Sequence, residues 1–179
     1  VESMMSEARM SPYSVREFML SQQLDVIKPN YDFIIIDTPP ALNILTINAY
    51  VASTGLIVPM EAEVLSLVGV SQIQDTIETV RKSFNPDLKV LGILLNKYDR
   101  RLTLSREILD LAESVAEQLG SQVFRSKIRR SVNVATAPAH GQSVLTYQPG
   151  CKAASDLRRI VDAVAGPEFP PHYRRIARY

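Results

Sequence analysis

One carboxylate in this sequence stands where phosphate chemistry would need it. Asp37 directly follows the apolar, β-branched run Phe33–Ile36, and Thr38-Pro39-Pro40 comes next. Such a run is typical of a strand buried on both faces of a parallel sheet. Ligands bind at the carboxyl ends of such strands, where a carboxylate can orient the water around a nucleotide-bound Mg²⁺. The alternative is an aspartate that only ends the strand and caps the next helix.

The histidines and the single cysteine have no partner residues in the sequence with which they could form a metal or catalytic site. His140 lies beside Gly141 and has no second histidine or cysteine at ligand spacing, and His172 lies near the end of the chain. Cys151 is the single cysteine, so no disulfide can form within the chain, and it has no neighbouring histidine to activate it. We therefore expect no metal site at the histidines and a packing role for Cys151.

Elements of two kinds alternate along the chain and would position Asp37. Short apolar runs predict strands at residues 31–37, 56–60, 90–95 and 122–124. Amphipathic patterns predict helices at about 12–28, 45–52, 64–83, 104–119 and 153–164. Strands alternating with helices of this length read as βαβ units. The fold class expected is α/β, with a mostly parallel sheet flanked by helices.

The composition is that of an ordinary globular protein. Apolar residues make up 46% and charged residues 22% of the 179 residues, and the formal net charge is +1. That charge excludes a generally basic nucleic-acid binder but leaves room for a local basic patch. Apolar runs are too short to span a membrane, and the first residues do not form a signal peptide.

Five motifs support a resemblance, from Tyr31 to Ala165, to the ParA/Soj family of deviant Walker ATPases, which are relatives of MinD. They stand in the family's order: Tyr31–Pro40, Leu45–Ala49, Val58–Glu63 followed by Leu67 and Gly69, Gly92–Asp99, and Ala137–Gly141 followed by Tyr147-Gln148-Pro149. The resemblance implies an N-terminally incomplete P-loop NTPase fold. It divides the chain into a partial N-terminal helical segment (1–30), the C-terminal part of a ParA-like ATPase domain (31–165) and a Pro/Arg-rich tail (166–179).

The resemblance also implies roles for single residues. Asp37 is similar to the Walker B acid, a catalytic residue near Mg²⁺, and Thr38, Pro39 and Pro40 to the switch that senses the γ-phosphate of ATP. Asn96 would contact the adenine, although it can also be read as a turn residue after a strand. The loop of residues 128–131 would pass near the base, but family members often have proline where Arg129 stands.

One part of the family pattern has no counterpart in these residues. The P-loop, a Gly-rich stretch with two lysines that cradles phosphates, should precede Tyr31, yet residues 1–30 contain no glycine. The switch I aspartate is missing as well. Phosphoryl transfer depends on positioning and charge stabilisation, so we expect no ATP hydrolysis by this chain alone.

Basic residues form the second candidate site. They gather in two segments: Arg100, Arg101 and Arg106, and then Arg125, Lys127, Arg129 and Arg130. ParA relatives bind DNA non-specifically through such residues, and phosphate contacts need only charge and reach. The second segment, Arg125–Arg130, is therefore the predicted DNA-binding cluster. The alternative is a solvated charged face.

The resemblance implies a cytoplasmic, nucleoid-associated protein that segregates or positions plasmids, chromosomes or other cargo. ATP and Mg²⁺ are the cofactors of the complete family protein, and this chain can be without either. The expected partners are a ParB-like or cargo-adaptor protein, non-specific DNA and, in the complete protein, a second copy. The prolines of the tail exclude a membrane-binding amphipathic helix. The alternative function is a non-catalytic, shortened homologue that serves as a protein-interaction module.

Overall fold

The computed structural model describes residues 16–39, 42–61 and 65–166. Contacts divide the chain into two compact units, one made of residues 1–56 and 70–89 and the other of residues 57–69 and 90–179. Within the described residues, no helix is both long and apolar enough to cross a membrane.

Unit 1 contains α2 (Met19–Ile27), the 3-10 turn η1 (Lys28–Asn30), α3 (Ile44–Ala52) and most of α4 (Leu65–Ser83). Asn43 starts α3, because its side-chain oxygen accepts hydrogen bonds from the backbone N–H groups of Leu45 and Thr46. Asn85 holds the other end of α3, where its amide nitrogen donates to the carbonyl oxygens of Tyr50, Val51 and Ser53. The core of this unit collects buried side chains of α3, α4 and the following loop: Ala49, Tyr50, Val51, Ile77, Val80 and Leu88.

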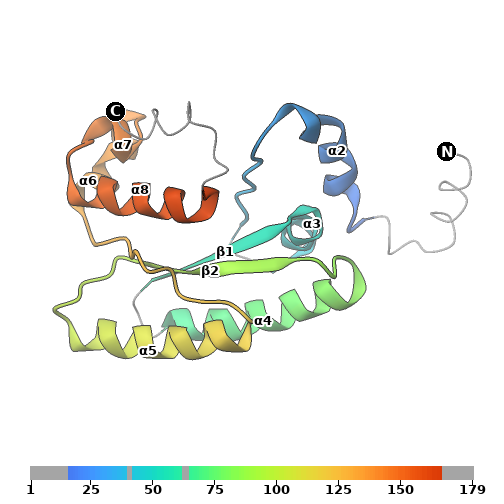
Figure 1. Ribbon diagram of the computed structural model, residues 1–179, viewed down its shortest axis with the longest axis horizontal. Coiled ribbons are helices and arrows are strands. Elements are labelled where there is room, and N and C mark those ends of the chain that lie inside the picture. Colours follow the sequence, from blue (N-terminus) through green and yellow to red (C-terminus); the bar gives the residue numbers. More distant parts are fainter. Residues whose placement is uncertain (1–15, 40–41, 62–64, 167–179) are drawn as a thin grey trace, which may run out of the picture. The chain divides into compact units, whose positions relative to one another are not determined.

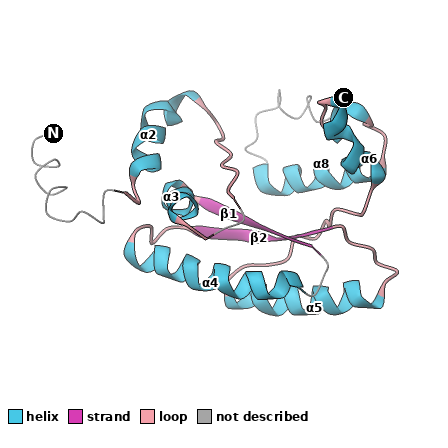
Figure 2. Ribbon diagram, turned by 180° about the vertical axis from the view of Figure 1, so that it is seen from behind, coloured by secondary structure: helices cyan, strands magenta, loops and turns pink. Residues whose placement is uncertain are grey.

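Unit 2 holds nearly all of the sheet. Strands β1 (Gly55–Glu61) and β2 (Lys89–Asn96) are hydrogen-bonded neighbours in a parallel arrangement. Helix α5 (Thr103–Gln118) lies on one face of β2 and α8 (Lys152–Ala165) on the other, as Figures 1 and 2 show from opposite sides. Between them come α6 (Val132–Thr136), the 3-10 helix η2 (Ala137–His140) and α7 (Val144–Tyr147). The α/β fold class is confirmed.

The helix ends of unit 2 follow local chemistry. Gly120, just past α5, has a φ of 65°, the left-handed conformation that glycine adopts at least cost. At the start of α8 the half-buried Cys151 thiol accepts a hydrogen bond from the Ala154 N–H at 3.4 Å. The predicted helices 45–52, 64–83, 104–119 and 153–164 are all present within one or two residues of their expected ends.

Two of the four predicted strands differ from expectation. Residues 31–39 belong to no strand or helix and include a bend at Asp32, and Ile35 is 93% exposed. A strand needs a neighbour for its backbone groups, and no described segment forms a ladder with this one. The predicted strand 122–124 is reduced to a parallel bridge between Val123 and Ile93 of β2.

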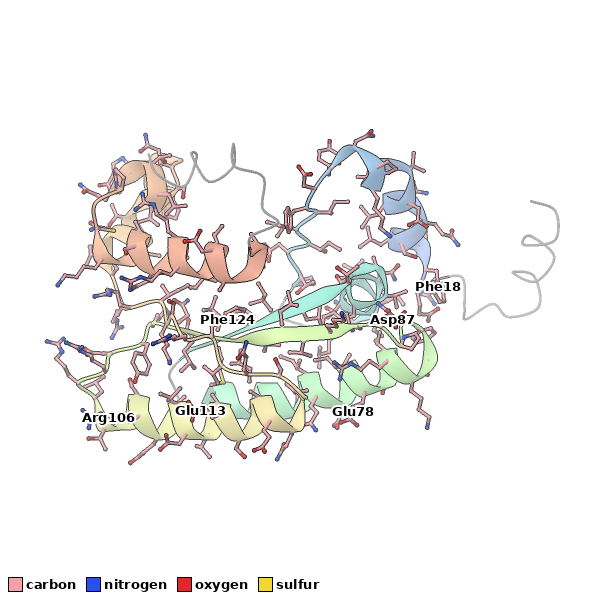
Figure 3. The ribbon with its side chains drawn as sticks, in the orientation of Figure 1. Phe18, Glu78, Asp87, Arg106, Glu113 and Phe124 are labelled. Atoms are coloured by element: carbon pink, nitrogen blue, oxygen red, sulfur yellow. The ribbon has the colours of Figure 1, made fainter. Side chains whose placement is uncertain are left out.

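The first predicted helix is shorter than expected. Its described part begins at Met19 and ends at Ile27, where Pro29 imposes a 3-10 turn. Met19 and Val26, expected on its apolar face, are exposed, whereas Phe18 packs edge-on against Phe84 with ring centroids 5.9 Å apart (Figure 3). Residues 12–15 of the prediction lie outside the described residues.

Candidate functional site

The Asp37 segment lies in unit 1. Asp37, Thr38 and Pro39 are exposed and belong to no helix or strand, and Pro40 lies outside the described residues. An exposed carboxylate followed by a threonine hydroxyl offers the oxygen ligands that Mg²⁺ accepts, so these residues fit a metal that retains most of its water. No group of three or more His, Cys, Asp or Glu side chains that could hold a metal occurs within the described residues.

A separate candidate site lies within unit 2, at the carboxyl end of β2. Asn96 ends the strand half-buried, and its side-chain oxygen accepts a hydrogen bond from the Lys97 N–H at 2.9 Å. The Asn96 amide nitrogen makes no hydrogen bond to a described residue. A side-chain amide placed in this way can still donate to a ring nitrogen of a base, as asparagine does when it pairs with adenine.

Lys97 gives this edge an unusual backbone. Its φ of 53° lies in the left-handed region, and no other non-glycine residue among those described has a positive φ. The Lys97 ammonium forms an ion pair with Glu61 at the carboxyl end of β1. The pair joins the ends of both strands, and both side chains are more than a third exposed, so its contribution to stability is small. Nothing in the sequence pattern at Lys97 indicates this conformation.

The predicted base loop runs beside the same strand end. Ile128 N–H donates to the Leu95 carbonyl at 2.9 Å, and Tyr98 N–H donates to the Ile128 carbonyl at 3.0 Å. Tyr98 and Arg129 form a parallel bridge. The structure therefore places Asn96 and the loop of residues 128–131 at one edge of the sheet, and their contact with adenine stays a prediction.

Arg129 differs from the rest of the basic cluster. Its guanidinium donates to both carboxylate oxygens of Asp156 on α8, with Nε–Oδ2 at 2.6 Å and Nη2–Oδ1 at 2.8 Å. These hydrogen bonds hold the pKa of the Asp156 carboxyl below its ordinary value and raise the pKa of Arg129. By contrast, Arg125 and Arg130 are exposed and enter no ion pair with a described residue. The Lys127 ammonium reaches only the Arg125 carbonyl, at 3.4 Å.

Asp156 was not among the residues singled out in the sequence. It is 3% exposed and stands on the buried face of α8 with Ala153 and Ile160. An aspartate at a position of an apolar helical stripe is the signal that could have found it, because a buried carboxylate requires a partner.

The C-terminal motif also forms a local contact. The rings of His140, at the end of η2, and Tyr147, at the end of α7, stack with centroids 5.0 Å apart and an interplanar angle of 16°. This stacking joins the two parts of the C-terminal motif. It places neither ring among the residues named at the carboxyl end of β2.

The chain is similar to proteins of chromosome partitioning. A family model described as an AAA domain, AAA_31, matches residues 2–90. The sporulation initiation inhibitor protein Soj of Bacillus subtilis is 37% identical over 160 residues, which are 89% of this chain and 62% of Soj. The chromosome partitioning protein ParA of Caulobacter vibrioides is 37% identical over 155 residues, 86% of this chain and 57% of ParA.

A solved structure agrees in fold and sequence. The cobyrinic acid a,c-diamide synthase of Mycobacterium smegmatis, solved with bound ADP and magnesium, is 32% identical and superposes with a TM-score of 0.61. The match covers 87% of this chain and 57% of the synthase. This chain thus spans only a little more than half the length of the proteins it matches.

Proposed function

Because the chain belongs to the ParA/Soj family, we propose that it is part of an ATPase that segregates or positions plasmids, chromosomes or other cargo. In this proposal ATP closes a dimer, the dimer holds DNA non-specifically, and a ParB-like or adaptor protein triggers release. The observation that carries the proposal is the 37% identity to Soj over 89% of this chain. The arrangement of the β2 edge supports it.

In this proposal the adenine of the nucleotide binds at the β2 edge. The Asn96 amide donates to the base, and the loop of residues 128–131 borders it, because both lie at the carboxyl end of a parallel strand, where ligands bind in such sheets. Asn96 and Ile128 are half-buried, and backbone hydrogen bonds already order this edge. Binding there requires little further ordering of the chain.

In this proposal Asp37 acts near the metal ion. Its carboxylate orients water on the Mg²⁺ that accompanies the nucleotide, and the Thr38 hydroxyl and the prolines follow it in the switch. Mg²⁺ supplies charge neutralisation at the phosphates when bound. The sequence has no Gly-rich loop ending in Lys-Thr, so this chain alone is proposed not to hydrolyse ATP. Mg²⁺-dependent ATP turnover by the purified 179-residue chain would contradict this.

DNA retention is assigned to the exposed basic side chains of the cluster. Arg125 and Arg130 are exposed and have no ion-pair partner among the described residues, so their charges are available to phosphates at little desolvation cost. Lys127 adds a third charge within the same short segment. No base-reading motif is needed, since phosphate contacts alone give non-specific binding.

The DNA assignment is tested by fluorescence anisotropy with a labelled duplex of arbitrary sequence over a salt series. The Arg125→Glu/Arg130→Glu variant should bind more weakly, and the slope of log K against log salt should fall by about 0.9 for each phosphate that the variant no longer neutralises. Lys82→Glu, an exposed position at the end of α4, makes the same kind of charge change outside the cluster. Equal binding by the cluster variant and the wild type, or no binding by the wild type at low salt, would remove DNA from the proposal.

The second candidate function is a non-catalytic interaction module that binds a ParB-like or ParA-like partner without nucleotide. The exposed apolar run Phe33–Ile35 favours it, because such a surface pairs readily with another chain. The adenosine titration described in the next subsection separates the two functions, since only the first requires the β2 edge to bind a base.

A further inference from the structure

The loop of residues 128–131 is tied to β2 on one side. Segment 122–128 runs beside the strand: Ile93 N–H donates to the Gln122 carbonyl, and Phe124 N–H donates to the Ile93 carbonyl, each at 2.9 Å. The ladder then continues through Ile128 to Tyr98, as described above. These bonds fix the path of the loop up to Ile128, and the loop turns away from the sheet after Arg129.

On the other side, the loop contacts α8 through the Arg129–Asp156 ion pair, and no other ion pair among the described residues joins the two. The carboxylate receives both guanidinium hydrogen bonds of Arg129 and a third, longer one from the Arg129 backbone N–H at 3.4 Å. Its side chain is 5% exposed, whereas that of Arg129 is 44% exposed. A buried carboxylate with a bidentate partner fixes both distance and orientation. The pair therefore determines where the loop lies relative to α8.

Arg129 is poorly placed to bind phosphate itself. To do so, its guanidinium would have to leave Asp156, and the buried carboxylate would be without its partner, which is costly. Its neighbour Arg130 is exposed and has no such constraint. The two adjacent arginines thus differ in their environment although they carry the same charge.

We propose that Arg129 and Asp156 form a positioning pair that holds the loop of residues 128–131 at the carboxyl end of β2 in the geometry that receives the base. The inference rests on the proposed function, in which this edge receives adenine. It assigns Arg129 a role through the loop rather than direct contact with nucleotide or DNA, and it assigns Asp156 a role in the same site.

The test is an amide chemical-shift titration of the full 179-residue chain with adenosine and, separately, guanosine. Adenosine should shift the signals of Asn96 and residues 128–131 in the wild type more than guanosine does. Arg129→Gln and Asp156→Asn should each weaken the adenosine response by about fivefold or more, as expected when one member of a coupled pair is removed. Arg129→Lys keeps the charge but not the bidentate geometry and should be intermediate. Lys152→Gln is the control, with the same charge change at an exposed position that starts α8 and lies outside the loop, and it should leave the response unchanged.

Hydrogen exchange of the Ile128 and Arg129 amides, measured on the same samples, distinguishes base binding at the β2 edge from positioning of the loop by the pair. If the wild type does not respond to adenosine, the base-binding function fails. The pair still stands as a positioning pair if protection falls in both pair variants but not in Lys152→Gln. If Arg129→Gln loses the adenosine response while Asp156→Asn keeps it, Arg129 contacts the base directly and the inference is overturned. Unchanged protection and unchanged binding in both pair variants would overturn it as well.

Discussion

Replacing Gly92 by alanine should destabilise the protein through one close approach. A Cβ built on Gly92, in the middle of β2, would lie 2.6 and 2.8 Å from the Cε2 and Cδ2 atoms of Phe124 and 3.1 Å from the Gln122 carbonyl oxygen. Distances below 3.0 Å are not tolerated, so something must move. The Phe124 ring is 6% exposed, and the Gln122 oxygen is held by a hydrogen bond to β2. Neither neighbour can move away without disturbing the segment that leads to the base loop.

The size of the effect follows from two opposing terms. Overpacking a filled core costs about 1–3 kcal/mol, while alanine lowers the entropy of the unfolded chain and returns about 0.4–1 kcal/mol. The net loss in the free energy of unfolding is therefore about 1–2 kcal/mol, which for a chain of this size corresponds to a fall in Tm of about 3–6 °C.

Urea denaturation followed by circular dichroism measures this loss. Gly150→Ala is the matched control, because a Cβ at Gly150 meets no atom within 4 Å. In a Phe124→Leu background, Gly92→Ala should cost less, since the smaller side chain leaves room for the added methyl group. A Gly92→Ala protein as stable as the wild type, or the same cost with and without the phenyl ring, would refute the close packing of Phe124 on β2.

Two further predictions concern charge and exposure. The Asp156 pKa is held low chiefly by its hydrogen bonds from Arg129, so its stabilisation is present above the unfolded value of about 3.9 and disappears as pH falls through the folded value. Urea titrations at a series of acidic pH values should show this fall, and Asp156→Asn should reduce but not abolish it, because Asp99 has a pKa of about 2 beside Arg101. If the free energy of unfolding of Asp156→Asn fell with pH as steeply as that of the wild type, the lowered pKa of Asp156 would not be the cause of the fall. Because Ile35 is 93% exposed, we expect it to promote self-association of the chain. Ile35→Asp should therefore reduce self-association measured by sedimentation velocity, with little change in Tm. An equal reduction in Val132→Asp, at another exposed residue, would show a general effect of added charge instead.

Most helices and the two central strands could be predicted because their signals are local. The apolar stripe of α5 repeats along the helix, and Gly120 marks its end, so neighbouring residues alone define the element. The short helices α6 and α7 were not predicted, because five and four residues are too few for a period to appear. The adenine roles of Asn96 and the loop of residues 128–131 came from resemblance alone and stay predictions, although the two lie at the same edge of the sheet.

The Phe33–Ile36 run shows where the pattern stops being sufficient. Its β-branched residues indicate a buried strand, but burial requires a partner strand that no local pattern supplies. Among the described residues the run instead borders a groove with a volume of about 210 Å³, whose other wall is the end of α3 and the start of β1. Asp156 escaped prediction for a related reason, since the partner that makes a buried aspartate tolerable lies 27 residues away in the chain.

The β2 edge of unit 2 and the Asp37 segment of unit 1 therefore differ in what supports the roles proposed for them. At the β2 edge, backbone ladders and the Arg129–Asp156 pair fix the side chains before any ligand arrives, so the adenosine and DNA experiments can be carried out on this chain. Asp37 lies in an exposed segment without a ladder, and its carboxylate acquires a defined position only if that segment is paired. An adenosine response at Asn96 without any Mg²⁺ response at Asp37 is accordingly the outcome that we expect. It would show that Asp37 lacks a fixed position because residues 31–39 belong to no strand, rather than because of the chemistry of its residues.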